Sequence, residues 1–60
     1  MTSIKAQITV RGRCKHHRAE CIFKRNRVLY QLAIVAETPA LARQMVEEAA
    51  REIEPLLVFI

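Results

Sequence analysis

Two prolines enclose the one stretch of this sequence that has helical spacing, and they limit what the chain can fold into. Thr38-Pro39 predicts a helix start. The Thr hydroxyl can accept a hydrogen bond from a free N–H of the first turn, and Pro at the first helical position has no N–H to leave unpaired. Pro55 ends the helix because the residue before a proline avoids the helical region. We therefore predict one helix over residues 39–54.

The predicted helix is amphipathic, with an apolar stripe that covers close to half of its circumference. The stripe consists of Leu41, Ala42, Met45, Val46, Ala49, Ala50 and Ile53. On the polar side, Glu47 and Arg51 are spaced for a favourable i,i+4 ion pair. The stripe is wider than packing on one sheet requires, so part of it is available to a partner.

The segments on either side of the helix have strand character. Residues 3–11 alternate polar and apolar side chains, as a half-buried strand does. Residues 19–24 resume strand character without showing which face is buried. Residues 28–36 are apolar on both faces, which predicts a central strand or one whose back contacts a partner. The apolar run 56–60 predicts a buried strand parallel to residues 28–36.

Short polar segments connect these strands. Gly12 closes the first strand, residues 13–18 are expected to form an exposed turn or loop, and Arg25-Asn26 predicts a tight turn. The order is therefore β-β-β-α-β. We predict a small α+β domain over residues 1–60, with a three- to four-stranded sheet and one helix packed on one face.

The size and apolar content of the chain predict self-association. A domain of 60 residues buries only about 60% of its unfolded surface, yet 52% of these residues are hydrophobic. We expect a homodimer whose interface includes Leu29, Val35, Leu57 and Phe59. In one version, residues 56–60 extend the sheet of the second copy.

Charge is divided unevenly along the chain. Residues 1–36 carry eight Lys or Arg and a single acid, Glu20, whereas residues 37–60 carry two Arg and five Glu, for a total net charge of +4. The expected binding residues for nucleic acid or an acidic protein partner are Arg11, Arg13, Lys15, Arg18, Lys24, Arg25 and Arg27. A third interpretation is a solvated edge whose charges prevent sheet aggregation.

Four potential metal ligands lie close together: Cys14, His16, His17 and Cys21. Zinc favours such residues, but its usual sites combine ligand pairs from distant segments, and the basic neighbours would repel a dication. A Cys14–Cys21 disulfide and a histidine-dependent nuclease are the other interpretations. We expect two free thiols and two loop histidines, with no metal or other cofactor, no small-molecule substrate and no enzymatic activity.

The sequence indicates a cytoplasmic protein with no membrane contact. Residues 1–10 lack the apolar core of a signal peptide. The longest apolar run, residues 56–60, is far shorter than the ~20 residues that span a bilayer.

The segment ETPALARQMVEEAAREI, residues 37–53, resembles the helix in N-terminal domains of HicAB-type antitoxins. It is also similar to the helix of three-strand-plus-helix DNA-binding domains of the AP2 and integrase-arm type. The chain departs from both, since it lacks the glycine-rich strand region of the first and the tryptophan and glycine pattern of the second. No site residue is carried over from either.

From these features we expect a small non-enzymatic binding or regulatory module, similar to phage or prophage accessory proteins. It would contact nucleic acid or an acidic partner through the basic hairpin. The alternative is an interaction, inhibitor or antitoxin-like module without nucleic-acid binding.

Overall fold

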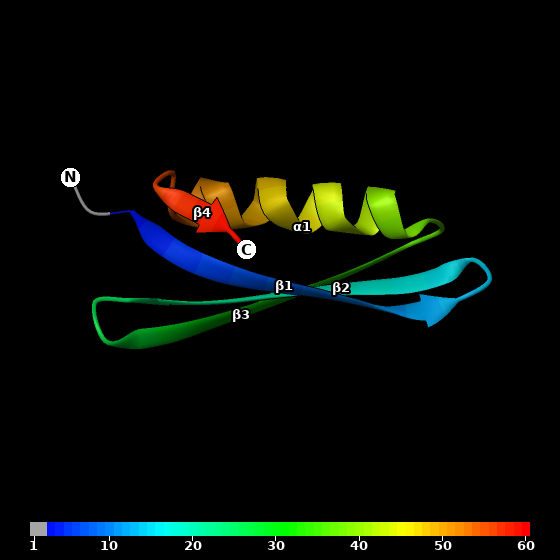
Figure 1. The fold of residues 1–60 in the computed structure, drawn as a ribbon, viewed down its shortest axis with the longest axis horizontal. Coiled ribbons are helices and arrows are strands. Elements are labelled where there is room, and N and C mark those ends of the chain that lie inside the picture. Colours follow the sequence, from blue (N-terminus) through cyan, green and yellow to red (C-terminus); the bar gives the residue numbers. More distant parts are fainter. Residues whose placement is uncertain (1–2) are drawn as a thin grey trace.

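The computed structural model describes residues 3–60 and confirms a small α+β domain, in which one helix packs on one face of a four-stranded mixed sheet (Figure 1). The elements are β1 (Ile4–Arg13), β2 (His16–Arg25), β3 (Val28–Ala36), α1 (Pro39–Ile53) and β4 (Leu57–Phe59).

The sheet has the strand order β3-β2-β1-β4. The first three strands are antiparallel neighbours, and β4 is parallel to β1, with Ile4 opposite Leu57 and Ala6 opposite Phe59. The last strand therefore runs parallel to β3, as predicted, but it pairs with β1 at the other edge of the sheet. The connection after α1 is short, and the amide of Ile4 donates to the Leu56 carbonyl oxygen at 3.2 Å, which places β4 beside β1 of its own chain.

Both hairpin turns consist of two residues. The β1–β2 turn is Cys14-Lys15, so both strands extend further into the polar stretch than the sequence predicted. Gly12 continues β1 instead of closing it, at a φ of +126°, and a Cβ there would overlap the His16 carbonyl oxygen. The β2–β3 turn is Asn26-Arg27, one residue later than predicted, and both residues have positive φ, as in a type I′ turn.

The helix caps follow the sequence prediction closely. The Leu41 amide donates to Thr38 Oγ1 at 3.1 Å, which confirms Thr38 as the N-cap. The helix ends at Ile53, one residue before the predicted end, and Glu54 is the C-cap. The predicted pairing of Glu47 with Arg51 is wrong, because Glu47 instead accepts from Arg43 Nε at 3.1 Å.

The core lies between α1 and the sheet and is built largely from alanine. Its fully or nearly buried members are Ala6, Ala19, Cys21, Phe23, Ala42, Val46, Ala50 and Leu57. Such small side chains allow a helix to approach a sheet closely. The apolar stripe is only partly used, since Leu41 and Met45 of α1 stay exposed.

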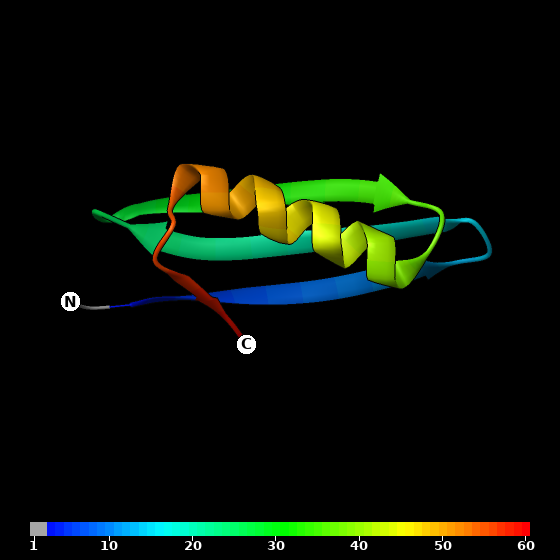
Figure 2. The same ribbon diagram turned by 90° about the horizontal axis from the view of Figure 1, so that it is seen from above.

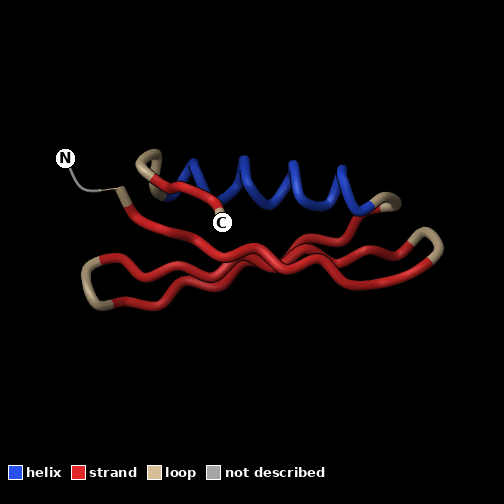
Figure 3. The backbone as a smooth tube through the Cα atoms, in the orientation of Figure 1, coloured by secondary structure: helices blue, strands red, loops and turns tan. Residues whose placement is uncertain are grey.

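The molecule is long and narrow, with extents of 39 × 17 × 16 Å. Viewed from above, α1 crosses the sheet diagonally over β2 and β3 (Figure 2). Figure 3 shows that the helix lies on one side of the strands and that no element within residues 3–60 covers the opposite side of the sheet. Among the residues described, no helix has the length and apolarity needed to span a membrane.

Candidate functional site

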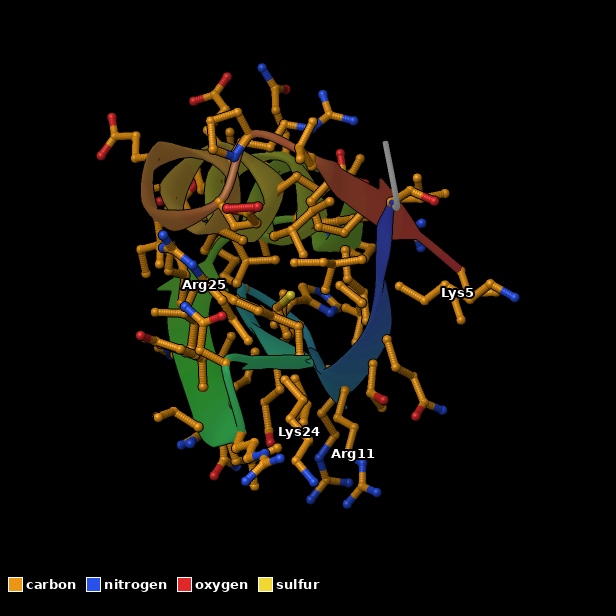
Figure 4. The ribbon with its side chains drawn as sticks, turned by 90° about the vertical axis from the view of Figure 1, so that its left-hand side faces the viewer. Lys5, Arg11, Lys24 and Arg25 are labelled. Atoms are coloured by element: carbon orange, nitrogen blue, oxygen red, sulfur yellow. The ribbon has the colours of Figure 1, made fainter. Side chains whose placement is uncertain are left out.

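The sheet face that points away from α1 is the candidate site, and we call it the bare face. Strand alternation determines its members, because Ala19, Cys21 and Phe23 of β2 are buried under the helix and their neighbours must point the other way. The view along the sheet shows Arg11 and Lys24 pointing away from the helix (Figure 4). The basic side chains at bare-face positions of β1 and β2 are Lys5, Arg11, Arg13, His16, Arg18 and Lys24.

The strand register concentrates positive charge at the β1–β2 turn. Arg11 is the cross-strand partner of Arg18, and Arg13 is the partner of His16. All four side chains are exposed, and Lys15 lies in the turn that follows. Like charges directly opposite one another destabilise a sheet. This arrangement therefore favours a bound anion at this end of the bare face.

One acid lies within the basic surface. Glu20 Oε1 is 3.3 Å from Arg18 Nε, and Glu20 is opposite Thr9 of β1. The Arg18 side chain remains 58% exposed in this pair. Glu20 therefore neutralises part of the charge while leaving the Arg18 guanidinium accessible.

The remaining basic residues lie away from this cluster. Lys24 is opposite Leu29 near the β2–β3 turn, which contains Arg27. Lys5 points sideways, past the β1 side of the sheet (Figure 4). The bare face thus has one dense basic end, the end with the β1–β2 turn, and a more sparsely charged opposite end.

Arg25 does not join the bare face, although the sequence placed it among the binding residues. Arg25 Nη1 donates to the Ile53 carbonyl oxygen at 2.9 Å, and its Nε is 3.8 Å from Glu54 Oε2. Figure 4 shows the Arg25 side chain directed toward the helix. A cation at the helix C-terminus satisfies a free carbonyl and interacts favourably with the helix dipole. The position of Arg25 therefore indicates a structural role.

The sequence did not identify this Arg25–Glu54 link. Strand alternation could have indicated it. Arg25 is two residues from Phe23, so the two side chains lie on the same face of β2. Glu54 is 8% exposed, an unusual environment for a carboxylate. Arg25 supplies the positive charge that this buried position requires.

The two histidines point to opposite faces of β2, because successive strand residues alternate. His16 is exposed opposite Arg13, whereas His17 Nε2 donates to the Cys14 carbonyl oxygen at 2.8 Å. They are strand residues and not loop residues as predicted. Within residues 3–60, no three His, Cys, Asp or Glu side chains gather as metal ligands do.

The cysteines are both free, in contrasting environments. Cys14 is exposed in the β1–β2 turn, and Cys21 is fully buried beneath α1. Burial raises the pKa of the Cys21 thiol, and the nearby Glu47 carboxylate raises that pKa further. Cys21 is therefore a neutral core residue at physiological pH.

The four expected interface residues occupy different environments. Leu29 and Val35 lie on the bare face of β3 and are 65% and 58% exposed. Leu57 is buried in the core of its own chain at 4% exposure. The half-buried Phe59 has the Arg51 guanidinium over its ring, with 5.0 Å between Cζ and the ring centroid. A surface partner can thus reach Leu29 and Val35, while Leu57 belongs to the core.

The fold and the surface together define a small α+β domain with one helix-covered sheet face and one bare, basic face. Comparisons of this chain with protein family models, curated proteins and solved structures found no match.

Proposed function

We propose that this protein is a small non-enzymatic binding module that contacts duplex nucleic acid through its bare face. The observation that carries the proposal is the direct cross-strand pairing of Arg11 with Arg18, beside Arg13 and His16. Phosphate groups between these side chains would replace mutual repulsion with charge-assisted hydrogen bonds.

A duplex fits this face better than a single strand does. Single-strand binding by sheets relies on aromatic side chains that stack with bases. Here Phe23 and Tyr30 stack on each other on the helix side, with ring centroids 5.0 Å apart. The paired strands β1 and β2 carry the basic cluster, and a major groove of about 12 Å admits a two-stranded ribbon of this kind.

Fluorescence anisotropy with a DNA duplex of about two turns, ~20 base pairs, over a salt series tests the proposal. Arg11→Gln and Arg18→Gln should each weaken binding and reduce the slope of log K against log salt by about 0.9. Glu20→Gln should strengthen binding, because it removes the acid beside Arg18.

Arg43→Gln is the matched control for this experiment. It removes the same charge, but from the helix, where Arg43 pairs with Glu47. Binding by this variant should match the wild-type protein. An affinity that does not change with salt, or an equal loss in Arg43→Gln and Arg11→Gln, would contradict contact through the bare face.

A second candidate function is the binding of an acidic protein surface. Exposed apolar side chains lie among the charges of the bare face, and they are Ile22, opposite Gln31, with Leu29 and Val35 of β3. Mixed apolar and basic surfaces of this kind also suit protein partners. Copurification would then recover one stoichiometric protein and no nucleic acid. Under either function we place the protein in the cytoplasm, where free thiols such as Cys14 remain reduced.

A further inference from the structure

The free edge of β3 is unusual because nothing in the strand protects it. β3 is nine residues long and forms one edge of the sheet. Its sequence, VLYQLAIVA, contains no charged residue and no proline. Natural edge strands usually carry such residues, because an exposed row of backbone N–H and C=O groups otherwise pairs with another strand. The opposite edge strand, β4, has only three residues.

The β2–β3 turn determines which backbone groups of β3 are free. A two-residue type I′ turn places its flanking residues, Arg25 and Val28, in a hydrogen-bonded pair. Alternate residues from Val28 onward therefore direct their N–H and C=O groups toward β2. The residues between them direct both groups toward the open edge, and these are Leu29, Gln31, Ala33 and Val35.

We propose that two copies of this protein pair antiparallel along β3, with a twofold axis at Leu32. In this register Leu29 lies opposite Val35 of the second copy, and Gln31 lies opposite Ala33. Leu29 and Val35 are 65% and 58% exposed on the bare face of one chain. In the dimer, Leu29 of each copy would cover Val35 of the other copy, so this contact forms at two symmetry-related positions. The outward-pointing backbone groups of both strands also meet as hydrogen-bonded pairs.

The neighbouring registers that keep these backbone pairs are worse. An axis at Gln31 places Val35 opposite Arg27 of the second copy, and an axis at Ala33 places Leu29 opposite Glu37. Each sets an apolar side chain against a charged one. With the axis at Leu32, the sequence of β3 is complementary to its own antiparallel copy. This self-complementarity favours a second copy of the chain as the partner.

The exposed apolar side chains of α1 do not have this property. Leu41 and Met45 of α1 are 44% and 40% exposed, but a helix flank offers no free backbone groups for pairing. Pairing along β3 would also join two bare faces into one surface, with Arg18 beside Val35 and Lys24 beside Leu29 on each copy. The inference concerns self-association alone and does not depend on the proposed nucleic-acid contact.

Molecular mass measured by sedimentation equilibrium over a concentration series tests the pairing. Wild-type protein should reach twice the chain mass. Leu29→Glu/Val35→Glu should remain at the single-chain mass, because like charges would face each other across the axis. Within one chain these glutamates lie opposite Lys24 and Arg18, which preserves the fold. Leu29→Glu/Val35→Lys should restore the double mass, because opposite charges then meet.

The Ala33→Pro variant tests whether the dimer uses the β3 edge at all, whatever its register. It removes an N–H that points away from β2, so the monomer should keep its circular dichroism spectrum while the dimer is lost. A wild-type mass that stays at one chain, or a dimeric Ala33→Pro variant, would overturn the proposal. Loss of dimer in both charge variants would overturn the Leu32 register. Whether a monomeric or a dimeric variant binds duplex DNA tests only the proposed function and leaves the pairing along β3 unaffected.

Discussion

At the residue scale, Arg25 and Lys24 show how one step along a strand separates structural from surface roles. Lys24 points away from the helix, while Arg25 reaches the C-terminal end of α1 (Figure 4). Both residues contribute equally to a count of charge along the sequence. Their roles differ because adjacent strand positions face opposite sides of the sheet.

Arg25→Ala should lower the free energy of unfolding by about 2 kcal/mol, because it leaves the Glu54 carboxylate and the Ile53 carbonyl without their partner. Urea denaturation followed by circular dichroism measures the change. Arg43→Ala removes an exposed i,i+4 pair and should cost no more than about 0.5 kcal/mol. Equal losses in the two variants would show that Arg25 has no special role at the helix end.

The candidate site could be predicted only in part from individual residues. Arg11, Arg13 and Arg18 were selected from charge alone, as members of the basic segment between residues 11 and 27. The pairing of Arg11 with Arg18 could not be predicted, because register depends on a turn that the sequence placed too broadly. Arg25 was expected at the surface because the sequence placed it in a turn, whereas it is the last residue of β2 and shares the helix-facing side with Phe23.

At the scale of elements, the β2–β3 turn carries a stability cost that can be removed. Arg27 has a φ of +66°, which side-chain-bearing residues rarely adopt and which type I′ turns usually assign to glycine. Arg27→Gly should raise the free energy of unfolding by about 1 kcal/mol, as measured by thermal or urea denaturation. Arg27→Ala loses the same charge but keeps the Cβ, so it should give no gain. A gain from both would attribute the effect to charge.

The bounds of the helix and of β3 were predicted almost to the residue, whereas the facing ends of β1 and β2 were not. Thr38, Pro39 and Pro55 act on the backbone directly, through a cap, a missing donor and a restricted neighbour. Strand ends near Gly12 and His16 extend into a stretch without apolar alternation, so periodicity could not detect them. The direction of β4 was predicted, but its pairing with β1 was not, because the direction of a strand does not determine which strand lies next to it.

At the scale of the whole molecule, burial of Cys21 links stability to alkaline pH. The folded state raises the pKa of this thiol, so it binds the proton more tightly than the unfolded chain does. The tighter proton binding contributes to the free energy of unfolding, and this contribution is fully present below about pH 8.5, the ordinary thiol pKa. It is lost as the pH rises from there toward the folded-state pKa.

Urea denaturation at a series of pH values from neutral to alkaline should therefore show a decline in stability that depends on Cys21. Cys21→Ala should be less stable at neutral pH, because it loses core packing, but its decline with pH should be shallower. Cys14→Ala is the control, since it removes the exposed thiol and leaves the buried one in place. Parallel curves for the wild type and Cys21→Ala would refute the link.

The alanine-rich core has a consequence for how this sequence can change over generations. In most small domains the large apolar residues resist substitution, because they fill the interior. Here Ala6, Ala19, Ala42 and Ala50 are fully buried where helix and sheet approach, so any larger side chain would force the layers apart. Meanwhile Leu41 and Met45 are exposed and free to vary. The most constrained interior positions of this fold are thus among its smallest residues.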